Sequence, residues 1–151
     1  MIALAKRAGA YVIATASPRN ADAVRAVGAD EIIDHTEADV LDAVSEQVEL
    51  LLNSTPSQPD EFTALVRLVR DGGVVVSTTA WMPALDDAGR DVRSVAVIVR
   101  SDGEKLAELV SLVDSGVLTL EVTRRITLTE LPELHAEAAE ERIVGKVIVI
   151  P

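Results

Sequence analysis

Short apolar runs rich in valine, isoleucine and leucine alternate along this chain with segments of helical composition. Within these runs, apolar and polar residues do not alternate, which is the pattern of strands buried on both faces of a sheet. Such strands belong to parallel sheets whose connections are helices. The sequence therefore predicts an α/β fold, with a mostly parallel sheet flanked by helices. The expected strands are 11–15, 31–33, 48–53, 74–77, 92–99, 120–128 and 146–150.

The segments between the apolar runs carry helix signals. Several of them end at a glycine, such as Gly28 or Gly116, as helices commonly do. The sequence from Ser101 to Glu104 has the form of a capping box and opens a helix with one apolar stripe. Thr36 and Asp39 frame another helix start. The expected helices are 2–8, 20–27, 39–46, 60–70, 101–115 and 130–142, and Asp71–Gly73 is expected to be a turn.

Length and charge narrow the class of protein. A chain of 151 residues suits one domain, and 48% hydrophobic residues can form its core. The net charge of −11 repels polyanions, so we expect neither nucleic acid nor an anionic membrane as a partner. No apolar run approaches transmembrane length, and the start imitates a signal peptide only faintly, so the cytoplasm is the expected location. With no cysteine and two histidines, we expect no disulfide and no metal site.

Two stretches of sequence carry a series of motifs in a recognisable order. The first runs from a strand through a Ser/Arg turn and a helix to "VGAD", a strand and "DHT". The second is the tail "SDGEKLAELVSLVDSGVLTLEVTRRITLTELPELHAEAAEERIVGKVIVI". Together they resemble the C-terminal half of the medium-chain dehydrogenase/reductase superfamily, in its zinc-independent, NADP-dependent quinone-oxidoreductase-like branch. The resemblance implies a single, truncated Rossmann-like domain over residues 1–151.

The resemblance also shows what this chain lacks. The segment "IALAKRAGA" resembles the second half of the first Rossmann helix, so we expect this sequence to lack the first strand and the glycine loop that grips the pyrophosphate. A GroES-like substrate domain has no counterpart either. In the strand order 3-2-1-4-5-6 the missing strand is central. We therefore expect a gap between strands 11–15 and 48–53, which either pair directly or are bridged by another chain.

Three residues are candidates for the adenosine end of a cofactor. Ser17 and Arg19 follow the strand at which NAD-binding relatives usually carry an acidic residue, and this chain has none there. A hydroxyl and a guanidinium suit the 2′-phosphate of NADP(H) instead. The alternative is a helix cap and a solvated surface charge. His35 lies where relatives place a side chain beside the adenosine, and the alternative is an exposed loop histidine.

Two further candidates end neighbouring strands. Asn53 and Thr78 lie at the carboxyl ends, where open α/β sheets bind ligands. In relatives these positions line the ribose and nicotinamide, while ordinary turn chemistry is the alternative. No acid–base constellation stands out, so we expect no catalytic residue in this chain. Trp81 and Met82 are expected to pack over the sheet edge.

The resemblance leaves two interpretations of function open. In the first, the chain is the nucleotide-binding portion of an NADP(H)-dependent oxidoreductase that reduces quinones or activated enones, and it is not competent alone. In the second, it is a non-redox, stand-alone relative that binds a small molecule or a partner, or acts as a cyclase. In relatives the counterpart of strand 92–99 pairs with its copy. We therefore expect a homodimer through that strand or through the sheet gap, or a separate N-terminal half as a partner.

Overall fold

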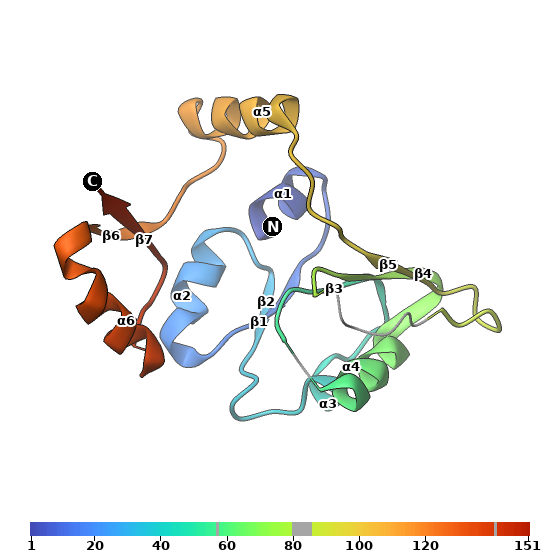
Figure 1. Ribbon diagram of the computed structural model, residues 1–151. Coiled ribbons are helices and arrows are strands. Elements are labelled where there is room, and N and C mark those ends of the chain that lie inside the picture. Colours follow the sequence, from blue (N-terminus) through green and yellow to red (C-terminus); the bar gives the residue numbers. More distant parts are fainter. Residues whose placement is uncertain (57, 80–85, 141) are drawn as a thin grey trace.

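The structure is a computed structural model that describes residues 1–56, 58–79, 86–140 and 142–151 (Figure 1). Trp81 and Met82 lie outside the described residues. The described helices are α1 (Ile2–Arg7), α2 (Pro18–Ala26), α3 (Val40–Ala43), α4 (Pro59–Leu65), α5 (Gly103–Asp114) and α6 (Leu131–Ala139), with 3-10 turns η1 (Val66–Leu68) and η2 (Leu128–Glu130). The described strands are β1 (Ile13–Thr15), β2 (Glu31–Ile33), β3 (Val48–Asn53), β4 (Val69–Ser77), β5 (Arg93–Ala96), β6 (Val122–Thr127) and β7 (Lys146–Ile150).

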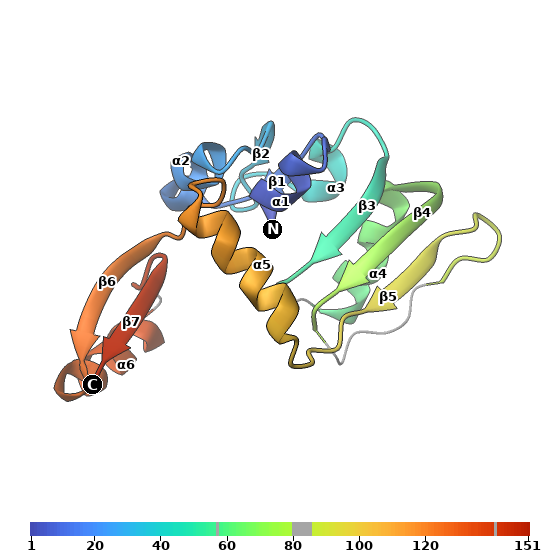
Figure 2. The same cartoon turned by 90° about the horizontal axis from the view of Figure 1, so that it is seen from above.

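The strands form parallel sheets flanked by helices, which confirms the predicted fold class (Figures 1 and 2). In the described residues β1 pairs with β2, β3 with β4 and β4 with β5, and β6 with β7, every pair in parallel. Strands β1 and β3 belong to different sheets, so the predicted gap is present and these strands do not pair across it. None of the described helices is long and apolar enough to cross a membrane.

The best-buried core lies between α4 and one face of the β3–β4–β5 sheet. Its centre is formed by four side chains that are almost completely buried: Phe62, Val69, Val75 and Val92. The pairing register places Leu51 beside Val75 on this face. The opposite face is covered less completely, since Leu50 is 56% exposed and Val95 46% exposed. Packing therefore stabilises this sheet mainly on the face that contacts α4.

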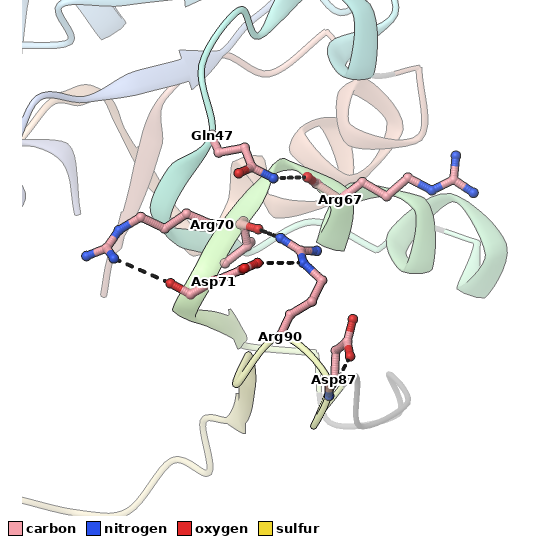
Figure 3. Close-up of polar contacts among 8 residues, drawn as sticks. Gln47, Arg67, Arg70, Asp71, Asp87 and Arg90 are labelled. Atoms are coloured by element: carbon pink, nitrogen blue, oxygen red, sulfur yellow. Dashed lines mark hydrogen bonds and ion pairs between the residues drawn. The ribbon is translucent and has the colours of Figure 1, made fainter.

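An arginine holds the irregular start of β4 in place (Figure 3). Between the pairs Val48–Val69 and Leu50–Val74, the register of β3 and β4 shifts, and β4 bulges around Gly72 and Gly73. Arg90 Nε donates to Asp71 Oδ1 at 2.9 Å, and Arg90 Nη2 donates to the carbonyl of Val69. The Arg90 carbonyl accepts from the Gly72 amide at 2.8 Å. The predicted turn at 71–73 is thus a bulge within a strand.

Several predicted elements have different bounds in the structure. The helix predicted over 60–70 stops at the 3-10 turn η1, because Val69 pairs with Val48 in the sheet. The helices predicted over 39–46 and 130–142 are shorter, at Val40–Ala43 and Leu131–Ala139. The strand predicted over 92–99 is only Arg93–Ala96. Strands β2, β3 and β7 have the predicted bounds.

The cap of α5 also differs from its prediction. The N-cap residue is Asp102, whose carboxylate accepts from the Lys105 amide at 3.0 Å. Ser101 therefore lies one residue before the cap, and Glu104 lies within the first turn instead of closing a capping box with Ser101. The predicted C-terminal stop is confirmed, since Gly116 follows the helix with a φ of 75°.

Helix α1 is attached to the β1–β2 pair through an ion pair. Lys6 Nζ lies 2.8 and 2.7 Å from the two carboxylate oxygens of Asp30 and also donates to the Ala10 carbonyl at 3.0 Å. Asp30 accepts a further hydrogen bond from the Val12 amide at 2.7 Å. The hydrogen bond from Lys6, followed by that from Val12, holds the pKa of Asp30 below its ordinary value of 3.8.

This lowered pKa predicts how acid affects the attachment of α1. A carboxyl group whose pKa is lower in the folded than in the unfolded state stabilises the fold above its unfolded pKa, and loses this effect as the pH falls through the folded pKa. We expect Asp30→Asn to be less stable than the native chain at neutral pH, with the difference closing below about pH 4. Urea unfolding of both chains, from neutral to acidic pH, measures this difference in the free energy of unfolding. Glu121→Gln, at an exposed carboxylate, is the control, and a constant difference for Asp30→Asn would contradict the prediction.

Candidate functional site

The first group of predicted site residues lies at the carboxyl ends of β1 and β2. These strands pair with Thr15 opposite Ile33, so Ser17 and His35 each follow the paired strand ends by two residues. Ser17 is the N-cap residue of α2, and Pro18 begins the helix, where its fixed φ is favourable. The Ser17 side chain makes no capping hydrogen bond. Arg19 and His35 are exposed, with Arg19 in the first turn of α2.

An ionised carboxylate lies beside His35. Asp34 Oδ1 accepts from the Thr36 hydroxyl at 2.6 Å and from the Thr36 amide at 2.9 Å. These two hydrogen bonds lower the pKa of Asp34 below its ordinary value. Asp34 is therefore negatively charged at neutral pH, which disfavours an anion immediately at His35. Among the residues that follow β1 and β2, Arg19 at the start of α2 supplies a positive charge that would favour a phosphate.

The second group lies at the carboxyl ends of β3 and β4. Asn53 and Ser77 are paired residues on the sheet face that packs against α4. The Thr78 amide donates to the Asn53 carbonyl at 3.0 Å, which continues the pairing one residue beyond β4. The Ser77 and Thr79 hydroxyls are 2.7 Å apart, and the Thr79 amide donates to Ser77 Oγ at 3.1 Å. The two strand ends thus carry a connected set of polar groups.

One donor in this set has no acceptor among the described residues. Asn53 Nδ2 is buried and makes no hydrogen bond there, while Asn53 Oδ1 accepts from the Thr55 amide at 3.3 Å. A buried amide without a partner costs about 1–3 kcal/mol, so a group that supplies an acceptor here is favoured. An ordinary turn accounts for the hydrogen bond that Asn53 Oδ1 accepts, but it provides no acceptor for Asn53 Nδ2 among the described residues.

The structure therefore separates the predicted residues into two groups on two sheets. Ser17, Arg19 and His35 follow β1 and β2, whereas Asn53 and Thr78 follow β3 and β4. Sequence reasoning did not single out Ser77, which is only 7% exposed. The sequence did offer a signal for Ser77. It is the polar last residue of an apolar strand, as Asn53 is in β3.

A hollow at the other end of β4 contains none of the predicted residues. It has a volume of about 430 Å³ and is lined by Thr63, Val66, Arg67, Asp86, Asp87, Ala88 and Arg90. Figure 3 shows that Arg67 extends away from Arg90 there, with its carbonyl accepting from Gln47 Nε2 at 3.1 Å. Because open α/β sheets bind ligands at the carboxyl ends of their strands, we place the candidate site at Asn53 and Thr78.

Comparison with known proteins identifies the family. The sequence pattern of the zinc-binding dehydrogenase family matches residues 27–149. The chain belongs to this family. It is 27% identical to the chloroplastic quinone-oxidoreductase QR1 of Triphysaria versicolor over 160 residues, which cover 99% of this chain and 48% of QR1. It is 34% identical to the spectinabilin polyketide synthase system protein NorB of Streptomyces orinoci, covering 98% of this chain and 7% of NorB.

A solved structure agrees with the sequence relatives. The quinone oxidoreductase of Coxiella burnetii matches with a TM-score of 0.84 and 28% identity, over 98% of this chain and 47% of that protein. The chain thus spans about half the length of these quinone oxidoreductases and corresponds to their C-terminal, Rossmann-like portion. These matches support a nucleotide-binding domain of the dehydrogenase type and do not favour the non-redox interpretation.

The residues of this family member do not fit a zinc site, despite the family's description. Zinc in proteins takes cysteine, histidine or carboxylate ligands arranged around one point. The chain has no cysteine, and its two histidines lie on different elements, His35 after β2 and His135 in α6. Across the described residues, no three His, Cys, Asp or Glu side chains gather into a metal-binding group.

Proposed function

We propose that this chain is the nucleotide-binding portion of an NADP(H)-dependent oxidoreductase of the quinone or enone reductase type. Asn53 Nδ2, which has no acceptor among the described residues, carries the proposal, because it offers a donor to a ligand at the carboxyl end of β3, where this fold binds one. When bound, the cofactor supplies the hydride, and the protein supplies orientation. Asn53 and Thr78 would hold its ribose–nicotinamide end. Ser17, Arg19 and His35 would hold its adenosine end.

Preference for NADP(H) over NAD(H) is part of this proposal. It is supported by a serine, a proline and an arginine after β1, where an acidic side chain would favour NAD(H). Arg19 in the first turn of α2 combines a guanidinium with the positive end of a helix. The negative charge of Asp34 disfavours a phosphate beside His35, so we assign the 2′-phosphate to Ser17 and Arg19.

We also propose that the chain does not turn over substrate alone. No glycine loop of the pyrophosphate-binding form occurs within these 151 residues, which span about half the length of the quinone oxidoreductases they match. The partner in solution is a separate N-terminal half or a second copy, joined through strand β5 or through the gap between β1 and β3. Location in the cytoplasm stays a prediction.

Titration with NADPH tests the proposed function. Without the pyrophosphate grip, we expect a Kd weaker than about 1 mM, equivalent to less than about 4 kcal/mol of binding free energy. NMR titration of the isotope-labelled chain should still shift the Asn53 side-chain amide and the Thr78 amide. NADPH should shift the residues around Ser17 more than NADH does, and Arg19→Ala should remove this preference.

Arg25→Ala is the matched control, because Arg25 lies on the same helix and pairs with Asp22 at 3.1 Å. Mass in solution should be recorded alongside. Binding tighter than about 1 mM by the chain alone would show that the glycine loop is dispensable. Shifts confined to other parts of the chain, or the same response to NADH and NADPH, would contradict the site and the cofactor preference respectively.

A further inference from the structure

A buried hydroxyl ends the apolar inner face of β4. On the face that packs against α4, the strand presents Val69, Gly73, Val75 and then Ser77. Among the described residues, Ser77 is the one polar residue whose side chain is buried in this way. A buried hydroxyl is unfavourable unless it is hydrogen-bonded, so the contacts of Ser77 indicate what it does at this position.

The Ser77 side chain bonds to the residue two positions further along the chain. The Thr79 amide donates to Ser77 Oγ at 3.1 Å, and the hydroxyl oxygens of the two residues are 2.7 Å apart. A serine hydroxyl that binds the backbone two residues later forms a turn that mimics a β-turn. Ser77 therefore turns the chain as soon as β4 ends.

Thr78 is the central residue of this turn, and hydrogen bonds attach the turn to both neighbouring strands. The Thr78 amide donates to the Asn53 carbonyl at 3.0 Å, and the Thr78 hydroxyl lies 3.4 Å from the same oxygen. On the other side, the Ser77 carbonyl accepts from the Val97 amide at 2.8 Å. The ends of β3 and β5 thus hold the backbone of the turn, and the Ser77 hydroxyl closes it from within.

The hydrogens of the two hydroxyl groups decide which one can donate to a ligand. One hydrogen lies between Ser77 Oγ and Thr79 Oγ1, so one hydroxyl donates to the other. If Thr79 donated, the Ser77 hydrogen would have only the Thr79 carbonyl, at 3.4 Å, which is too long for a good O–H···O bond. Ser77 therefore donates, and the Thr79 hydrogen has no acceptor among the described residues. Asn53 Nδ2 is a second such donor, at the end of the paired strand.

We propose that Ser77 is a positioning residue for the cofactor site at the ends of β3 and β4. Its hydroxyl acts through Thr79, so that the Thr79 hydroxyl and the Asn53 amide offer two donors to acceptor groups of the ligand, such as carbonyl or hydroxyl oxygens. This inference rests on the proposed function, because it takes these strand ends to bind NADP(H). One buried hydrogen bond contributes only modestly to folding, so stability alone does not account for a hydroxyl at this point of an apolar face.

NMR titration of the full chain and its variants with NADPH, well below its Kd, tests this role. Ser77→Ala and Thr79→Val should each reduce the NADPH-induced shift of the Asn53 side-chain amide by about threefold or more, as expected for the loss of one oriented hydrogen bond. Ser77→Thr keeps the hydroxyl and should respond like the native chain. The double variant should respond like either single variant, because both substitutions remove the same oriented donor.

Ser115→Ala is the matched control, because it removes a serine hydroxyl that also bonds locally, to the Leu112 carbonyl at 3.2 Å, at the end of α5. It should leave the response to NADPH unchanged. Urea unfolding should show that every variant is folded under the conditions of the titration. Thr79 is only partly buried, so Thr79→Val keeps the test decisive even if Ser77→Ala does not fold.

The possible failures are distinguishable. If the native chain responds to NADPH and Thr79→Val or a folded Ser77→Ala responds equally, the positioning role is wrong while the proposed function stands. Additive losses in the double variant, or a loss in a folded Ser77→Thr as large as in Ser77→Ala, would overturn the role in the same way. A native chain whose Asn53 and Thr78 signals do not respond to NADPH would contradict the proposed function at this site, and the role of Ser77 with it.

Discussion

Replacing Phe62 by alanine is expected to unfold the β3–β4–β5 sheet. Phe62 is 1% exposed and is the largest side chain in the cluster with Val69, Val75 and Val92. Truncating a buried phenylalanine costs about 3–5 kcal/mol, which is a large share of the about 5–15 kcal/mol that stabilises a typical small domain. Hydrogen exchange of the β4 amides measures the effect, because it reports the opening of this sheet directly.

Two variants bracket this result. Leu106→Ala removes a side chain that is 62% exposed, and it should change stability by less than about 0.5 kcal/mol. Phe62→Leu keeps most of the apolar volume and should cost less than about 1.5 kcal/mol. If Phe62→Ala left the exchange of the β4 amides as slow as Leu106→Ala does, the core would not lie where the structure places it.

Replacing Gly73 by alanine is expected to disrupt the bulge at the start of β4. A Cβ at this position would lie 2.5 Å from Val69 Cγ1 and 2.8 Å from the carbonyl oxygens of both Arg70 and Glu49. The two carbonyls belong to paired strands and cannot move without breaking the pairing, so the cost should be about 3 kcal/mol or more. The Gly72 amide, which donates to the Arg90 carbonyl, should lose its exchange protection.

The neighbouring glycine gives a matched comparison. Gly72 has a φ of 73°, and nothing lies within 4 Å of the Cβ that alanine would add. Gly72→Ala should therefore cost only the left-handed backbone conformation, about 1–2 kcal/mol. Urea unfolding of the two variants checks the order. Equal losses would mean that backbone conformation alone explains this glycine pair and that the close approach of β3 does not matter.

The strands were predictable because their burial and pairing agree with local composition. The apolar runs at 31–33, 48–53 and 146–150 are strands with the predicted bounds. Strand β5 is shorter than the predicted strand 92–99 because a residue counts as part of the sheet only where it pairs with β4. Strand β4 ends at Ser77, opposite Ala96, and the Val97 amide makes the last hydrogen bond, to the Ser77 carbonyl at 2.8 Å. Residues beyond that point have β-strand composition, but no strand among the described residues pairs with them.

Tertiary contacts decided the points at which sequence reasoning failed. Val69 completes a helical spacing with Phe62 and Val66, yet pairing with Val48 draws it into β4. The stripe on α5 fits an amphipathic helix, and its sequence gives no sign that the rest of the chain leaves it uncovered.

The candidate site could likewise be predicted from the sequence only in part. Placement of Asn53 and Thr78 at strand ends follows from the order of the elements, and the structure confirms it. The burial of Asn53 Nδ2, and its lack of an acceptor in the part of the chain that the structure describes, depend on neighbours that the sequence does not specify. The roles of Ser17, Arg19 and His35 stay predictions, since their positions after β1 and β2 fit both a nucleotide site and a solvated corner.

The division of the described strands into separate sheets has a consequence for cooperativity. Every pair joins strands that are consecutive in sequence, so each sheet forms from local contacts with small loop-closure costs. Ladder hydrogen bonds do not connect β2 and β1 to β3, or β5 to β6, in the described residues. Each sheet can then open at its own free energy, as an independent folding unit. A central strand inserted between β1 and β3 would couple two of these units into one cooperative transition.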